Sequence, residues 1–261
     1  AFCSLNLIEG RIFAQSKEFP LLLWEDNFEW GEQPNQAFWN FEIGTGHNGW
    51  GNNELQFYTN RKQNVRVEDG KLIIQAQKET YKGNGYTSAR ITTQKKKEFK
   101  YGRVEVRAKL PGGTGLWPAI WMLGSNINQV GWPECGEIDI MEYVGFDPGV
   151  IHATMHTPSS HGNSINSEEI LVSDAEDAFH IYAMEKTVEA IKFYVDGQLY
   201  YTYNPSTKDA STWPYEQNHF LILNVAVGGN WGGKEGIDDS VFPQQMEIDF
   251  VKFFGLPNGG K

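Results

Sequence analysis

Residues 131–157 read GWPECGEIDIMEYVGFDPGVIHATMHT, and the rest of the chain is arranged around this stretch. Three carboxylates, Glu137, Asp139 and Glu142, lie within six residues in a segment that is otherwise β-branched, aromatic and apolar. Such a segment is typical of a buried strand, where an unpaired charge is unfavourable. The acids therefore either line a solvated face or take part in chemistry, and the apolar residues between them favour chemistry.

The spacing of the three acids predicts a β-bulge. Side chains alternate along a strand, so Glu137 and Asp139 share a face while Glu142 falls on the opposite one. One inserted residue near Ile140 or Met141 returns Glu142 to the face of Glu137. The two glutamate Cα atoms would then lie about 13 Å apart. Side chains that lean together reduce the carboxyl separation to roughly 5 Å, the spacing of a retaining glycosidase.

A second strand returns after the carboxylates. Residues 145–149 read GFDPG, which is rich in turn residues, and residues 150–157 have strand character, so the two strands form a hairpin. A turn near Asp147 pairs the three acids with three residues of the returning strand: Glu142 with His152, Asp139 with Thr154, and Glu137 with His156.

Two histidines of the hairpin therefore share the carboxylate face. Two His and one Glu could hold a metal, although zinc prefers another ligand spacing and a third ligand is not evident. We expect His156 to donate a hydrogen bond to substrate and His152 to be a packing residue.

Composition limits the class of partner. The chain has 261 residues, of which 40% are hydrophobic and 14% aromatic, enough for a substantial core. Its 22 basic and 33 acidic residues give a formal charge of -11, which argues against nucleic acid, anionic membranes and polyanionic substrates. A neutral polymer is the expected partner. No stretch approaches the length of a transmembrane helix.

Two cysteines, Cys3 and Cys135, are too few for a disulfide framework, and whether they pair stays open. Cys135 lies two residues before Glu137. It could be a nucleophile, but a small filler beside the site is the preferred interpretation. Residues 1–20 are expected to form an N-terminal extension and residues 21–261 a single domain.

Nine tryptophans favour a carbohydrate-binding surface. Aromatic faces stack on the apolar faces of sugars, and the indole N–H is a hydrogen-bond donor. Six of the nine lie near Gly, Asn or Pro, which favours loops and cleft walls over a uniform core: Trp39, Trp50, Trp117, Trp121, Trp132 and Trp231.

Short strands separated by turn residues account for most of the chain. They are expected at residues 21–24, 71–76, 102–110, 117–123, 220–227 and 246–254, with a second hairpin at 189–203. One short helix is expected near residues 173–179. This pattern, with 28 glycines, predicts an all-β fold: a two-sheet antiparallel β-sandwich of the jelly-roll kind, with a concave sheet face as the substrate cleft.

The sequence resembles glycoside hydrolase family 16, and within it the laminarinase-like endo-1,3-β-glucanases. The motif GEIDIMEYVG at 136–145 carries the resemblance, including the Met141 that separates the laminarinase-like branch from the bulge-free lichenase branch. Further matches are GWGNNELQ at 49–56, TSAR at 87–90, YGRVEVRAKLP at 101–111, GLWPAIWML at 115–123 and AVGGNW at 226–231. The resemblance extends from Leu21 to Phe254.

This resemblance implies endo-hydrolysis of 1,3-β-D-glucan with retention of configuration, through a covalent glycosyl-enzyme intermediate. It implies that Glu137 is the nucleophile, Glu142 the general acid/base and Asp139 an assistant that hydrogen-bonds to the nucleophile. Burial near other carboxylates would raise the pKa of Glu142, as its role requires. No cofactor is expected for catalysis.

The resemblance also implies binding residues. The substrate-binding set is Asn53, Arg90, Trp117, Trp121 and Trp132 on the non-reducing side, His156 close to the cleavage point, and Trp231. Arg90 is either a structural salt bridge or a fork that binds sugar hydroxyls, and we favour the second. Family members often hold a structural calcium ion on the convex side. The matching positions are Asn27, Gly70 and Asp249, with Asn27 where an acid is common.

Two other functions remain open: a mixed-linkage 1,3-1,4-β-glucanase, and a β-glucan-binding module without hydrolytic activity. Binding modules with this fold have typically lost the catalytic acids, whereas this chain keeps all three, which disfavours that alternative. We expect a secreted or cell-surface protein that acts as a monomer on neutral β-glucan, with no nucleic-acid partner and no membrane span.

Overall fold

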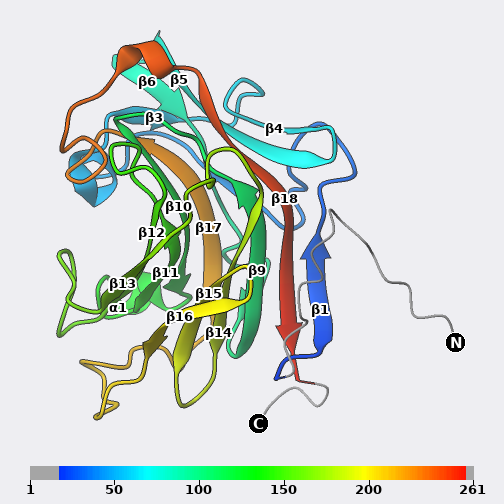
Figure 1. Cartoon of the computed structure of the whole chain (residues 1–261), viewed down its shortest axis with the longest axis vertical. Helices are drawn as coiled ribbons and strands as arrows, with labels where there is room; N and C mark the ends of the chain where they lie inside the picture. Colours follow the sequence, from blue (N-terminus) through cyan, green and yellow to red (C-terminus); the bar gives the residue numbers. More distant parts are fainter. Residues whose placement is uncertain (1–17, 257–261) are drawn as a thin grey trace, which may run out of the picture.

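The computed structural model describes residues 18–256, which form two β-sheets packed against each other (Figure 1). One sheet has ten strands and the other has eight. The described strand pairs are antiparallel, apart from the parallel pair of β3 (Gln56–Tyr58) and β6 (Asn84–Ser88). The predicted all-β sandwich is therefore confirmed.

The order of strands in each sheet sets where the site can form. The ten-stranded sheet runs β16 (Gln198–Tyr203), β15 (Ile191–Val195), β14 (His180–Lys186), β9 (Gly102–Lys109), β18 (Gln244–Gly255), β5 (Lys71–Tyr81), β6 and β3, with β1 (Leu21–Asp26) on β18 and β4 (Val65–Glu68) on β5. The eight-stranded sheet runs β13 (Ser167–Leu171), β12 (Val150–His156), β11 (Glu137–Glu142), β10 (Leu116–Gly124), β17 (His219–Val227), β7 (Arg90–Thr92) and β2 (Asn40–Glu42), with β8 (Glu98–Phe99) on β17. Figure 1 shows β17 and β10 curving along their length.

The hydrophobic core lies between the two sheets. Along β10 and β17, alternate residues such as Ile120 and Leu223 are fully buried in this core, together with Val106 of β9 and Val251 of β18. The intervening residues, among them Trp121, point to the other face of the eight-stranded sheet. That outer face is free to carry polar and aromatic side chains.

The predicted strands are present, with ends that differ by a few residues. The helix expected near residues 173–179 was wrong, because that segment consists of turns. The carbonyl of Ala175, which a helix would direct to Phe179, accepts the amide of Leu110 at 3.0 Å instead. Helical structure is limited to short pieces in the described chain: η1 (Gly49–Asn53), α1 (Ile127–Val130) and η2 (Asp239–Val241).

One tryptophan expected in a loop or cleft wall lies in the core. Trp39 is 0% exposed, and its indole N–H donates to Asp26 Oδ2 at 2.9 Å. The nearby polar residues suggested a loop, but an acceptor distant in sequence satisfies the indole and permits burial.

The N-terminal extension falls, up to residue 17, outside the described residues, as does Cys3. Its boundary with the domain, and the pairing of Cys3, therefore stay predictions. Within residues 18–256, no helix is both long enough and apolar enough to cross a bilayer.

We expect Leu221→Ala to destabilise the sandwich. Leu221 is 0% exposed between the sheets, so its truncation should lower the free energy of unfolding by about 2–5 kcal/mol. The matched control is Leu199→Ala, at a position that is 48% exposed, where the change should be below about 0.5 kcal/mol. Urea unfolding followed by fluorescence measures both, and equal effects would contradict this assignment of the core.

Candidate active site

Strand β11 carries the three carboxylates, and its pairing is irregular on both sides. Against β10 the register shifts between Ile120 and Trp121, and against β12 it shifts between Asp139 and Glu142. One residue of β11, Ile140, has no partner on β10, and its side chain is buried in the core. The predicted bulge is therefore confirmed and lies at Ile140.

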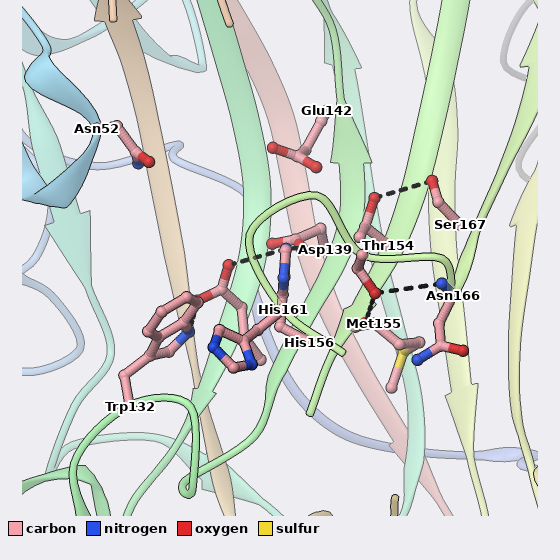
Figure 2. A network of polar contacts seen from close by, with 12 residues as sticks. Asn52, Trp132, Asp139, Glu142, Thr154, Met155, His156, His161, Asn166 and Ser167 are labelled. Atoms are coloured by element: carbon pink, nitrogen blue, oxygen red, sulfur yellow. Dashed lines mark hydrogen bonds and ion pairs between the residues drawn. The ribbon is translucent and has the colours of Figure 1, made fainter. Parts of the chain in front are cut away.

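The bulge places all three acids on the outer face. Across β11 and β12 the pairs are those predicted: Glu137 with His156, Asp139 with Thr154, and Glu142 with His152. On the other side of β11, Trp121 lies opposite Asp139. Directly opposed residues share a face, so the acids, both histidines and the tryptophan project together. Figure 2 shows Glu142, Asp139 and His156 in this cluster.

A charged histidine lies among the acids. His156 Nε2 is 3.1 Å from Asp139 Oδ2 and 3.6 Å from Glu137 Oε1. Burial lowers the pKa of His156, but the hydrogen bond with Asp139 and the charges of Asp139, Glu137 and Glu142 outweigh it and raise the pKa to about 10. Burial, together with the charges of the two glutamates, also raises the pKa of Asp139. Both shifts describe one proton held between Asp139 and His156.

Glu142 keeps its proton near neutral pH. Its residue is only 8% exposed, and burial raises the pKa of Glu142 to about 7, with the His156 charge opposing this shift and the Glu137 charge adding to it. Trp117 Nε1 donates to Glu142 Oε1 at 3.1 Å. A carboxyl that is protonated at this pH and close to a second carboxylate is the arrangement that acid/base chemistry needs.

Glu137 is held from two directions. Trp132 Nε1 donates to Glu137 Oε2 at 2.8 Å, while His156 lies beside Oε1. The ring of Trp132 is 44% exposed and lies 6.0 Å from His156 and 5.2 Å from His161, between ring centroids. Figure 2 shows Trp132 and the two histidines gathered beside Asp139. His161 was missed from the sequence because it belongs to a loop with no distinctive pattern.

Two residues fasten the end of the hairpin that carries Glu137. The Tyr215 hydroxyl donates to the carbonyl of His156 at 2.7 Å and lies 3.3 Å from the carbonyl of Glu137. Gly136 adopts φ +73°, and a Cβ there would lie 2.5 Å from the carbonyl oxygen of Pro214. Only glycine fits this close approach. Tyr215 was not predicted as a site residue, because its partners lie far away along the chain.

Trp231 and His152 lie beside Glu142. Trp231 makes edge contacts with Trp117 at 5.6 Å and with His152 at 4.9 Å, between ring centroids. Burial lowers the pKa of His152, and Glu169 lies 3.8 Å from its Nδ1. Its Nε2 is buried without a hydrogen-bond partner in the part of the chain that the structure describes. His152 is thus a packing residue, as expected, but an incompletely satisfied one.

Of the two alternatives for Arg90, a structural salt bridge or a fork that binds sugar, the structure shows the salt bridge. Its Nε donates to Glu42, and its guanidinium stacks between the rings of Trp50 at 4.4 Å and Trp121 at 4.7 Å. The structure therefore gives Arg90 three protein partners, while direct binding of sugar hydroxyls stays a prediction. Trp50 was missed as a member of this group, since only the fold brings it to Arg90.

The remaining binding residue, Asn53, is exposed, and its Nδ2 donates to Asn230 Oδ1 at 2.8 Å. Trp121 Nε1 donates to Asn224 Oδ1 at 2.7 Å. Asn224 was missed, although a single asparagine within the apolar run FLILNVAV could have indicated it.

Three side chains of the site are close enough to hold a metal. Ligand atoms of Glu137, Asp139 and His156 lie within 4.8 Å of one another. Among residues 18–256, no other group of three or more His, Cys, Asp or Glu side chains is this close together. A protonated imidazole has no lone pair for a metal, so the raised pKa of His156 favours an ion pair here. His152 does not belong to the group, so the site with two histidines and one glutamate does not form.

The positions matched to a calcium site converge in the sheet. Strand β1 pairs with one part of β18 and β5 with another part, and Asp249 lies between the two parts. Asn27 follows β1 and Gly70 precedes β5, so both belong to the ends of strands that pair with β18 on either side of Asp249. Oxygen ligands of this kind fit calcium. Arg107 Nη1 donates to Asp249 Oδ2 at 2.7 Å, so this carboxylate also has a protein partner.

Cys135 does not have the character of a nucleophile. It is fully buried against Leu123, Phe220 and Ile222, and burial raises the pKa of its thiol to about 12. Only the thiolate reacts readily, so the interpretation as a small filler is favoured.

Comparisons with known proteins find a matching family model and similar proteins of known structure or activity. Residues 52–252 match the model of the family described as glycosyl hydrolases family 16. The beta-glucanase of Rhodothermus marinus is 45% identical over 244 residues, covering 89% of this chain and 84% of the relative. A glucan endo-1,3-beta-glucosidase of Cryptopygus antarcticus is 39% identical and covers 90% and 96%. The crystal structure of a laminarinase from Flavobacterium sp. UMI-01 superposes with a TM-score of 0.84 at 51% identity, covering 89% and 99%.

The raised pKa of Glu142 predicts a pH dependence of stability. The folded value of about 7 exceeds the ordinary value of 4.5, so the unfolded chain releases this proton first. Stability from the protonated carboxyl is complete below about pH 4.5 and is lost as pH rises to about 7. Glu142→Gln cannot ionise, so its Tm relative to wild type should rise across this interval and then stay level.

Thermal unfolding between pH 4 and pH 8 measures this difference. The matched control is Glu168→Gln, on the exposed edge strand β13, whose Tm difference from wild type should vary little with pH. A Tm difference for Glu142→Gln that is constant across the whole range would contradict the raised pKa.

Proposed function

This chain belongs to glycosyl hydrolase family 16, and from that premise we propose that it hydrolyses 1,3-β-D-glucan within the chain and with retention of configuration. The observation that carries the proposal is the bulge at Ile140, which turns Glu137 and Glu142 to one face. The relatives named above as a beta-glucanase, an endo-1,3-beta-glucosidase and a laminarinase support the choice of glucan.

In the first step, a carboxylate oxygen of Glu137 attacks the anomeric carbon. The bond between that carbon and the glycosidic oxygen breaks, and Glu142 gives its proton to the departing oxygen. The raised pKa of Glu142 supplies that proton near neutral pH. The products are a glycosyl ester on Glu137 and a free sugar hydroxyl.

In the second step, water attacks the anomeric carbon from the side that the departing sugar has left. Glu142, now a carboxylate, takes a proton from the water, and the ester bond to Glu137 breaks. Two inversions restore the original configuration. Both residues then return to their starting protonation states.

Asp139 and His156 position the nucleophile. The proton that they share keeps a positive imidazolium beside Glu137, which holds this carboxylate in place. Trp132 fixes the other oxygen of Glu137. Trp117 fixes the acid/base through its indole N–H. Reacting groups that are oriented before substrate arrives avoid reorganisation during the reaction.

The composition and the aromatic residues support a neutral polysaccharide as substrate. The formal charge of -11 opposes polyanions, and Trp117, Trp121, Trp132 and Trp231 border the carboxylates. A mixed-linkage 1,3-1,4-β-glucan is the alternative substrate, because it presents the same neutral sugar faces. A polysaccharide does not cross a membrane, so we place the activity outside the cell, on a secreted or cell-surface protein that acts as a monomer.

Incubation with laminarin tests the proposal. Reducing ends should accumulate, and proton NMR of fresh product should show the β anomer first, because two displacements retain configuration. An inert mixture with retained binding would instead favour the β-glucan-binding module. Faster cleavage of mixed-linkage glucan than of laminarin would favour the alternative substrate.

Glutamine variants test the two roles. Glu137→Gln should lose nearly all turnover, and Glu142→Gln should lose roughly 100-fold to 10,000-fold, the usual worth of acid/base assistance. Thermal unfolding checks that both variants stay folded. A loss of only a few-fold at Glu142 would exclude it as the general acid.

We also propose that a calcium ion binds between β1 and β5, through main-chain oxygens of Asn27 and Gly70 and the carboxylate of Asp249. Added calcium chloride, compared with a chelator, should raise the Tm of wild type by roughly 2–8 °C, since a ligand that binds only the folded state stabilises it. Asp249→Asn should abolish this response, whereas Asp177→Asn, at an exposed position, should keep it. A wild-type Tm that does not depend on calcium would refute the site.

A further inference from the structure

A buried hydrogen-bond network ends at Trp121, one of the tryptophans of the site. Its centre is Glu54, in the loop segment that reads GWGNNELQ at 49–56. Glu54 Oε2 accepts from Gln56 Nε2 at 2.6 Å and from the Tyr58 hydroxyl at 3.1 Å, while Asn52 Nδ2 lies 3.5 Å from Oε1. Gln56 and Tyr58 are both 0% exposed.

The network continues to the surface of the site. The Tyr58 hydroxyl accepts from Asn224 Nδ2 at 3.1 Å, and Asn224 Oδ1 accepts from Trp121 Nε1 at 2.7 Å. An indole can only donate, so Asn224 accepts with Oδ1 and donates with Nδ2 to the Tyr58 hydroxyl, which in turn donates to Glu54. The tyrosine hydroxyl and the asparagine amide are therefore each oriented by their neighbours. This chain fixes the indole ring of Trp121.

A second branch joins two loops. Gln56 Oε1 accepts the amide of Val227 at 2.7 Å, at the end of β17. The carbonyl of Asn52 accepts the amide of Asn230 at 2.7 Å. These bonds tie the segment 49–53 to the segment that leads into Trp231. The backbone of segment 49–53 is strained, since Trp50 has φ +56° and Asn53 has φ +55°. These hydrogen bonds hold it in that conformation.

We propose that Glu54 is a positioning residue for substrate binding, which acts through Tyr58 and Asn224 on Trp121. The inference rests on the proposed function, since it assigns Glu54 a role in the affinity for glucan. Glu54 does not take part in the displacement itself. Loss of the network should therefore weaken the binding of chains that reach Trp121 and leave the chemistry at Glu137 unchanged.

Two variants break the network. Tyr58→Phe removes the hydroxyl that links Asn224 to Glu54, and Glu54→Leu removes the oxygen that accepts from Gln56 and Tyr58. If Glu54→Leu does not fold, Tyr58→Phe carries the test. The matched control is Tyr194→Phe, because the Tyr194 hydroxyl also donates to a carboxylate, Glu185 Oε2, at 2.6 Å. Tyr194 lies on β15, far from β3 in the order of the same ten-stranded sheet.

Steady-state kinetics on laminari-oligosaccharides of increasing length measure the effect. Tyr58→Phe should raise KM by about three- to tenfold for long oligosaccharides, with kcat changed by less than about twofold. The increase should vanish for oligosaccharides too short to reach Trp121. Tyr194→Phe should lose stability and keep the KM of wild type. A purely structural role would lower Tm without this dependence on chain length.

A double-mutant cycle tests the route through Trp121. In a Trp121→Phe background, which lacks the indole N–H, Tyr58→Phe should raise KM no further. Additive increases, a fall in kcat alone, or an unchanged KM would overturn the proposal.

Titration of oligosaccharides into the Glu142→Gln protein, with and without Tyr58→Phe, separates this proposal from the proposed function. If wild type binds oligosaccharides but does not cleave them, hydrolysis is refuted, and the ratio of the two Kd values still decides the role of the network. If there is no binding at all, both proposals fail.

Discussion

The site depends on keeping three carboxylates and one imidazolium together on a face of the sheet where little water reaches them. Asp139, Glu142 and His156 are 2%, 8% and 8% exposed. Three ionised acids at such a place would be strongly destabilising, so the cluster must hold protons. It does so twice: one proton lies between Asp139 and His156, and another stays on Glu142 because burial raises its pKa. The raised pKa of Glu142 reduces the number of buried charges in the folded protein, and the same raised pKa is what acid/base chemistry requires. Tyr215 and Gly136, which fasten the chain at Glu137, oppose the tendency of these like-charged groups to move apart.

The eight-stranded sheet sets the distance between this cluster and the groups that would bind the sugar chain. From His152, one row of directly paired residues passes through Glu142, Ala119 and Asn224 to Arg90 and Glu42. Strands are about 4.8 Å apart, so Glu142 and Arg90 lie roughly 15 Å from each other along the row. Asn224 lies two strands from Glu142 and one strand from Arg90, and there it accepts the indole N–H of Trp121. A regular ladder therefore places the acid/base, the ring of Trp121 and the stacked guanidinium at fixed intervals, and the bulge at Ile140 brings Glu142 into that row.

Local patterns predicted the parts of the site that depend on strand alternation. The bulge, the hairpin and the three pairs between β11 and β12 follow from a period of two and one turn, so they could be read from the residues alone. Features that depend on distant partners could not. Trp39 is buried because Asp26 accepts its N–H, residues 173–179 stay in turns because Leu110 takes a helical carbonyl, and Arg90 is engaged by Glu42 and two indoles. In each of these cases the deciding contact joins residues that only the folded sheets bring together. The roles assigned to the catalytic, binding and calcium residues remain predictions that rest on geometry and family likeness.

In the proposed mechanism, the net charge of the cluster also stays constant. Glu137 acts as the carboxylate before attack, and Glu142 holds a proton. When Glu137 becomes an ester its charge disappears, and that charge is one of the contributions that raise the pKa of Glu142. Its loss lowers the pKa of Glu142 in the same step in which Glu142 must release its proton. The His156 imidazolium, whose pKa is about 10, remains charged throughout and stabilises whichever glutamate is ionised. In the proposed mechanism, one net negative charge therefore moves between the two glutamates, while the Asp139 carboxylate and the His156 imidazolium offset each other, so the net charge of the buried site does not change between the two steps.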